Sequence, residues 1–70
     1  MRQTEIEAAL RAASLRVTGP RVAVLEVVGE QPHSDAGTVL HGVRERLGAV
    51  STQAVYDVLK ALTGAGLLRR

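Results

Sequence analysis

The side chains with the most specific chemistry stand together after residue 50. Gln53 can pair with adenine through its amide, and the ring of Tyr56 can contact a thymine methyl group. Ser51 precedes an apolar repeat and is expected to cap a helix. The start of such a helix offers free backbone N–H groups to a phosphate. These residue types, in this order, suit the reading of base edges in a DNA groove.

The same chain offers little to an enzyme. No carboxylate pair, nucleophile–base pair or glycine-rich phosphate loop stands at a usable spacing. The absence of cysteine excludes disulfides and thiolate metal sites within these residues. No apolar run approaches the roughly 20 residues of a membrane span, and no secretory signal is recognisable. We therefore expect a cytoplasmic protein that is not an enzyme and has no membrane partner.

The charges are unevenly distributed along the chain. Residues 1–21 carry four arginines and two glutamates, residues 22–50 carry two arginines and four acidic residues, and residues 51–70 carry three basic residues and one aspartate. Two basic segments around an acidic middle suit a protein that presents two separate segments to a polyanion. Charges on solvated helix faces give the same pattern, so charge alone does not decide between these readings.

Four amphipathic helices are expected to position these side chains. Thr4 and Glu7 form a capping-box pattern that predicts the start of the first helix. The other three begin after Thr18, after Ser34 or Asp35, and after Ser51. The residues expected to line the core recur at helical spacing: Ile6, Ala9, Leu10, Ala13, Val24, Leu25, Val28, Ala36, Val39, Leu40, Val43, Leu47, Val55, Val58, Leu59 and Leu62.

The last two helices are separated by Ala49-Val50-Ser51, after a stop at Gly48. That spacing matches a helix-turn-helix, in which the second helix brings its N-terminal residues to base edges in the major groove. Proteins that do not bind DNA also contain capped amphipathic helices with Gln and Tyr outside. A module that docks another protein on this helix is the alternative, and it would lack the steep salt dependence of DNA binding.

Four segments resemble motifs of the ferric uptake regulator (Fur) family. Residues 15–21 (LRVTGPR) resemble L-[KR]-x-T-x-x-R, and residues 31–36 (QPHSDA) look like a stretch containing H-x-[ST]-A. Residues 50–56 (VSTQAVY) resemble [IV]-S-x-A-T-V-Y, and residues 62–68 (LTGAGLL) resemble L-x-x-x-G-[LI]-[IV]. The form STQAVYD looks most like the actinobacterial, peroxide-responsive branch, whose members regulate catalase-peroxidase.

This resemblance implies a mainly α fold: a winged helix-turn-helix with four helices and a truncated β-wing. The winged-helix DNA-binding domain would span residues 1–70, with the wing strand starting at 67–70 and the C-terminal dimerisation domain absent. A strand that starts in the last four residues has no ladder partner here, so we expect the chain to be part of a longer protein.

The family's function is implied in the same way. The resemblance implies a metal-dependent transcriptional repressor of iron and peroxide-stress genes such as catalase-peroxidase. The full-length protein would be a homodimer, and it would bind a palindromic, A/T-rich double-stranded DNA operator. Tyr56 would contact bases, Arg16 would reach the minor groove or backbone, and Arg21 would bind phosphate. The expected DNA-binding residues are Arg16, Arg21, Ser51, Thr52, Gln53, Tyr56, Asp57 and Lys60. Many relatives have Arg where this chain has Asp57, and a carboxylate there can accept from a cytosine amino group.

His33 corresponds to a metal ligand of the family. One imidazole binds Fe(II), Mn(II) or Zn(II) only weakly. We therefore expect His33 to be a ligand only in the full-length protein, with a regulatory Fe(II) or Mn(II) and a structural Zn(II), and no cofactor in this fragment.

Overall fold

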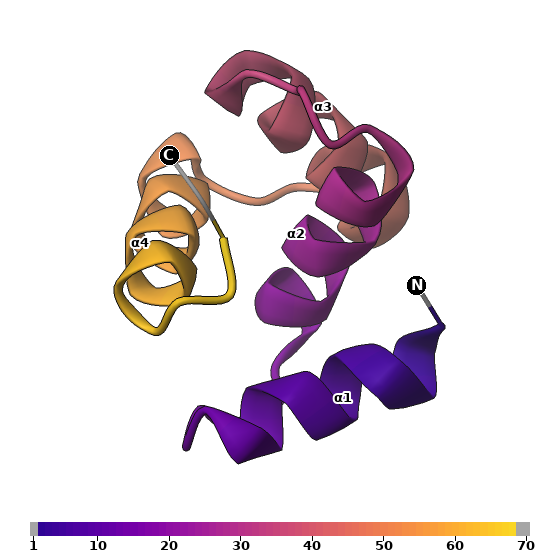
Figure 1. The fold of residues 1–70 in the computed structure, drawn as a ribbon. Coiled ribbons are helices and arrows are strands. Elements are labelled where there is room, and N and C mark those ends of the chain that lie inside the picture. The colour runs from indigo at the N-terminus through magenta and orange to yellow at the C-terminus, as the bar shows by residue number, and fades with distance from the viewer. Residues whose placement is uncertain (1, 69–70) are drawn as a thin grey trace.

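Residues 2–68 are described by a computed structural model, and they form four α-helices joined by short loops (Figure 1). The helices are α1 (Gln3–Ala12), α2 (Gly19–Glu30), α3 (Ala36–Leu47) and α4 (Thr52–Gly64). The mainly α class and the four expected helices are confirmed. Leu67 and Leu68 lie in no strand, and the other two residues of the expected wing strand fall outside the described part of the chain. The winged helix-turn-helix assignment therefore stays a prediction.

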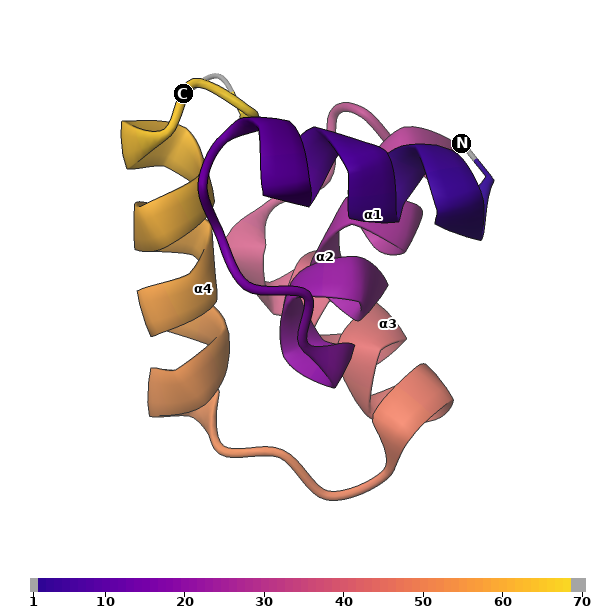
Figure 2. The same cartoon turned by 90° about the horizontal axis from the view of Figure 1, so that it is seen from below.

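Helix α2 is the centre of the arrangement. It contacts each of the other three helices, and α3 also contacts α4 (Figures 1 and 2). The buried apolar side chains gather around it: Ile6, Leu10, Ala23, Val24, Leu25, Val27, Val39, Val43, Val55 and Leu62. No helix in the described residues is both long enough and apolar enough to cross a membrane.

One expected core residue was wrongly assigned. Leu47, predicted to face inward from the last turn of α3, is 44% exposed. A Cβ placed on Gly19 would lie 3.7 Å from Leu47 Cδ2, so the start of α2 is opposite this side chain. Because glycine has no side chain, that end of α2 cannot cover Leu47.

Three helix starts follow the predicted caps. Thr18 Oγ1 accepts from the Arg21 N–H at 3.3 Å, and Ser51 Oγ accepts from the Ala54 N–H at 3.0 Å. For α3, the N-cap is Asp35, whose Oδ1 accepts from the Thr38 N–H at 2.8 Å.

The predicted start of α1 at Thr4 was wrong. The N-cap is Arg2, whose backbone N–H donates to Glu5 Oε1 at 3.4 Å, and Thr4 already lies inside the helix. A carboxylate in the first turn is favourable because it meets the positive end of the helix dipole. Here Glu5 rather than Glu7 takes that role.

Left-handed residues end three of the helices. Gly48 has φ +82° after α3, and Gly66 has φ +81° after α4. After α1 the residue is Ser14, with φ +61°, and the Leu15 N–H then donates to the Leu10 carbonyl at 2.9 Å. Such a backbone suits glycine but strains a residue with a Cβ.

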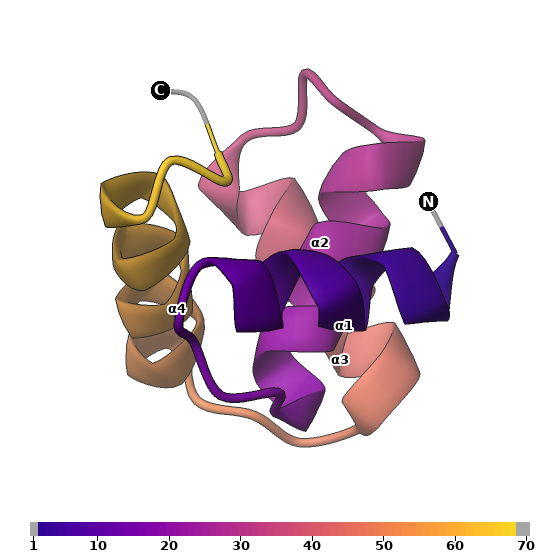
Figure 3. The same ribbon diagram turned by 60° about the horizontal axis from the view of Figure 1, so that its bottom comes forward.

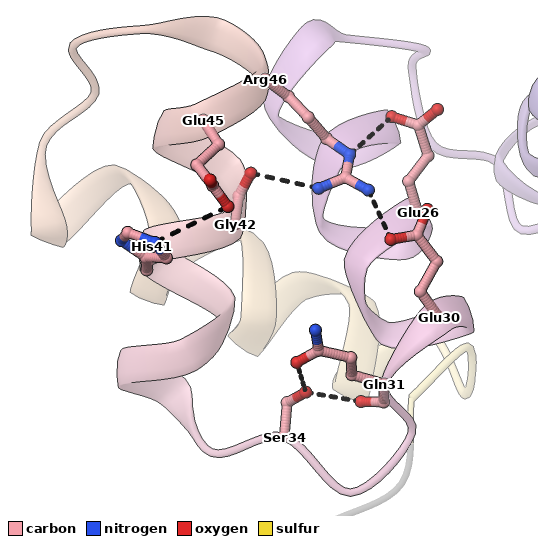
Figure 4. Close-up of polar contacts among 8 residues, drawn as sticks. All are labelled: Glu26, Glu30, Gln31, Ser34, His41, Gly42, Glu45 and Arg46. Carbon is pink, nitrogen blue, oxygen red and sulfur yellow. Dashed lines mark hydrogen bonds and ion pairs between the residues drawn. The ribbon is translucent and has the colours of Figure 1, made fainter.

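Helices α2 and α3 pack closely at Gly42, which is buried. A Cβ added to Gly42 would lie only 2.7 Å from Val27 Cγ2. Beside this contact, Arg46 on α3 donates to Glu30 at 2.7 Å and lies 3.7 Å from Glu26, both on α2 (Figure 4). The hydrogen bond to Glu30 is the main reason that the pKa of Arg46 is raised. The close packing at Gly42 holds α3 on α2, and so fixes where the chain turns toward α4, whereas partly exposed ion pairs such as those of Arg46 add little.

Candidate nucleic-acid interface

The outer face of α4 carries the predicted base-reading side chains. In Figures 1 and 2, α4 forms one edge of the molecule, and no other helix covers its outer side. Val55 and Leu62 point into the core. The residues left on the surface include every one predicted for this segment: Ser51, Thr52, Gln53, Tyr56, Asp57 and Lys60.

Tyr56 is half exposed, at 50% of its surface, although it is the only aromatic residue of the chain. It lines a shallow hollow on α4 with Leu59, Lys60, Thr63 and Gly64. An aromatic ring exposed beside a lysine can contact a base while the lysine contacts the nearby phosphate backbone.

Gln53 and Asp57 form a pair one helical turn apart. Gln53 Nε2 donates to Asp57 Oδ1 at 2.9 Å. A carboxylate only accepts hydrogen bonds, so the amide nitrogen of Gln53 must face Asp57. This leaves one amide N–H and the amide oxygen of Gln53 available, as well as further acceptor positions on Asp57. The pair was not predicted, although its i, i+4 spacing on a helix is a recognisable signal.

The loop between α1 and α2 carries the second predicted group. Arg16 is exposed, and its backbone carbonyl accepts from Arg21 Nη1 at 2.9 Å. Arg21 therefore ties this loop to the first turn of α2 and keeps other N–H donors of its guanidinium free. Figures 2 and 3 show the loop passing beside α4. The structure joins Arg16 to Arg21, and gives neither a hydrogen bond to the α4 residues.

Arg44 is a residue that the sequence analysis did not select. From α3 it donates to the Val50 carbonyl at 3.2 Å and to Thr52 Oγ1 at 3.4 Å. These partners lie on both sides of the Ser51 cap. No sequence pattern predicts the contact of Arg44 with these residues, because it crosses a turn whose path depends on Gly48.

His33 lies apart from these residues, exposed in the loop between α2 and α3. It lines a hollow with Gln31, Pro32, Ser34, Asp35 and Thr38. Beside it, the Ser34 hydroxyl donates to the Gln31 carbonyl at 2.6 Å (Figure 4).

The carboxylate next to this loop is already engaged. Asp35 accepts from the Thr38 backbone, and this hydrogen bond is the main reason that its pKa is lowered. Within residues 2–68, no group of three or more His, Cys, Asp or Glu side chains gathers as metal ligands would. These residues alone do not fit a metal site, and His33 offers a single imidazole.

Comparison with known proteins identifies a family for this chain. The model of the ferric uptake regulator family matches residues 12–70. The chain is 62% identical over 61 residues to "Transcriptional regulator FurA" of Mycobacterium tuberculosis (strain ATCC 25618 / H37Rv). The matched stretch covers 87% of this chain and 42% of that protein.

A second relative gives a similar result. "Ferric uptake regulation protein 1" of Mycolicibacterium fortuitum is 56% identical over 61 residues, covering 87% of this chain and 38% of that protein. The chain thus spans less than half the length of these relatives. No solved structure matches it at a comparable level of significance.

Proposed function

This chain belongs to the ferric uptake regulator family, and on that premise we propose that it is the sequence-specific DNA-binding part of a metal-dependent transcriptional repressor. The observation that carries the proposal is the outer face of α4, where the Ser51 cap and the five polar or aromatic side chains that follow it remain exposed. Its targets would be iron and peroxide-stress genes such as catalase-peroxidase.

In the proposed complex, the N-terminal half of α4 lies in the major groove. Ser51 accepts from the Ala54 N–H, and the N–H groups of Thr52 and Gln53 at the same helix start can bind a phosphate. Tyr56 contacts a base, with a thymine methyl as the natural partner of its ring. Thr52 and Lys60 lie on the same exposed face and contact the backbone or bases near the groove edge.

Gln53 and Asp57 would act on bases as a pair. Gln53 alone can form two hydrogen bonds with adenine, but one of its amide protons is directed to Asp57. Asp57 can also accept from a cytosine amino group. The pair therefore favours a site different from that of relatives with Arg at this position.

The arginines of the α1–α2 loop would supply the second contact. Arg16 reaches a minor groove, and a narrow A/T-rich groove attracts such a cation through its negative potential. Arg21 binds a phosphate while its Nη1 holds the Arg16 carbonyl. The contact of Arg16 with the minor groove and the contact of Arg21 with a phosphate would fix the position of α4 along the DNA duplex.

The rest of the regulator would come from outside these residues. Residues 1–70 would form the winged-helix domain, and a dimerisation domain would pair two such domains on a palindromic, A/T-rich operator. His33 would join ligands from that other part to hold Fe(II) or Mn(II), with Zn(II) at a structural site. Metal binding there would shift the population between dimers that can and cannot grip DNA.

A DNA titration tests this proposal. The affinity of the chain for an A/T-rich operator duplex should fall steeply as salt rises, because phosphate contacts release counterions. Tyr56→Ala should lose the operator preference, at a cost on the order of 1–3 kcal/mol for one base contact, while Tyr56→Phe keeps the ring and most of the preference. Leu47→Ala is the matched control, since Leu47 is the other exposed large apolar residue among residues 2–68. Unchanged operator binding by Tyr56→Ala would remove Tyr56 as a reader, and salt-independent binding would favour a protein-docking module.

A further inference from the structure

The turn between α3 and α4 lacks backbone hydrogen bonds of its own. In the described part of the chain, neither Ala49 nor Val50 takes part in a backbone–backbone hydrogen bond. Gly48, with φ +82°, can adopt conformations that other residues avoid. Val50 packs against the core and α4 packs on α2, and beyond this packing the path of the turn must be fixed by polar side chains.

Arg44 supplies that restraint. Its Nε–H donates to the Val50 carbonyl at 3.2 Å and its Nη2–H to Thr52 Oγ1 at 3.4 Å. Val50 is the last residue before the cap and Thr52 is the first residue of α4. One rigid guanidinium thus holds the chain on both sides of Ser51.

We infer that Arg44 is a positioning residue, which orients the N-terminus of α4 for base reading without itself reading a base. This rests on the proposed DNA-binding function. A reading helix must be held within about 0.5 Å of its productive position, so a restraint at its first residue affects specificity strongly. Arg44 is exposed, and its contacts contribute little to global stability. Its effect is on the geometry of one helix end.

A lysine at position 44 cannot make both of these hydrogen bonds. The guanidinium presents its donors in a planar fork, whereas an ammonium group is a single point on a flexible stem. Arg44→Lys keeps the charge but loses the two-point contact. It should therefore behave like Arg44→Gln in any measurement of geometry.

The first test needs no DNA. Amide hydrogen exchange of the chain should accelerate severalfold at Ala54 and Val55 in both variants, because these N–H groups bond to Ser51. The buried amides of α2 should exchange as in the unsubstituted chain. Unchanged exchange at Ala54 and Val55 would overturn the inference, whatever the chain binds.

The second test measures DNA affinity at several salt concentrations. Both Arg44 variants should bind the operator duplex about tenfold more weakly, keep their affinity for random duplex, and keep the slope of log affinity against log salt. Arg46→Gln is the charge-matched control on α3, and it should keep the preference for operator over random duplex since its contacts go to Glu26 and Glu30.

Two results of this titration would overturn the positioning role. If Arg44→Gln weakens binding to all sequences equally and lowers the salt slope by about one, Arg44 contacts phosphate instead. If the Arg44 variants match the unsubstituted chain, Arg44 does not position α4. If the unsubstituted chain binds no duplex, the proposed function fails, and the exchange experiment still decides the role of Arg44.

Discussion

Gly42→Ala should destabilise the domain, although alanine is the better helix former. The added Cβ would lie 2.7 Å from Val27 Cγ2 and 3.1 Å from Cγ1, closer than real carbon contacts allow. Val27 is 3% exposed and β-branched, so it cannot swing aside easily. The helix must move away from α2 or the side chain must leave its rotamer.

The magnitude follows from two opposing effects. Replacing glycine by alanine inside a helix gains up to about 1 kcal/mol. Overpacking of a closely packed contact costs about 1–3 kcal/mol. Gly37→Ala in the same helix is the matched control, because its Cβ would meet only Asp35 Oδ1 at an ordinary 3.6 Å. The two variants should differ by about 1–3 kcal/mol, or several degrees in Tm for a domain of this size.

Urea and thermal unfolding, followed by far-ultraviolet circular dichroism, measure this difference. A double variant with Val27→Ala completes a double-mutant cycle. Gly42→Ala should lower the free energy of unfolding by less when the Val27 methyl groups are absent. If Gly42→Ala is as stable as Gly37→Ala, the close packing of α2 on α3 is wrong, and so is the account of how α3 is held.

Three other predictions concern the helix ends and the reading face. Ser14→Gly should raise stability by roughly 1 kcal/mol in urea unfolding, because Ser14 has φ +61° and glycine removes that strain; a loss of stability would contradict it. The pKa of Asp35 is lowered from 3.8 by the Thr38 N–H, so its contribution is complete above that value and is lost as the pH falls through the lower folded-state pKa. Urea unfolding from pH about 5 to about 2 should therefore show the unsubstituted chain losing stability relative to Asp35→Asn, which caps but does not titrate; parallel profiles would refute this. Asp57→Arg should change which duplex sequences are selected from a random pool, because it frees Gln53 and removes an acceptor; identical selected sequences would show that Asp57 is not near a base.

Helix starts could be predicted where the signal is local. Thr18, Asp35 and Ser51 each bond an N–H three residues ahead, a contact within one turn. Thr4 failed because two similar capping patterns overlap within the first turn, and a sequence does not say which carboxylate turns back. Leu47 fits its helical stripe, but its exposure depends on the neighbour opposite, which is Gly19.

The candidate site could be predicted where it depends on spacing within one helix. The exposure of Tyr56 follows from its place outside the buried stripe that Val55 and Leu62 form on one helix. The contact of Arg44 with Val50 and Thr52 could not be predicted, since it spans a turn directed by Gly48. Residue types set the chemistry of the face, whereas tertiary structure sets how it is held.

Chemical-shift mapping shows which helix of this chain contacts DNA. Isotope-labelled chain would be titrated with an A/T-rich operator duplex, and amide shifts would be followed along residues 2–68. We expect the largest changes on residues 51–60 and 16–21, and these changes should diminish as salt rises. Changes concentrated on α1 or around the His33 hollow, with α4 unaffected, would contradict the assignment of α4 as the helix that reads DNA.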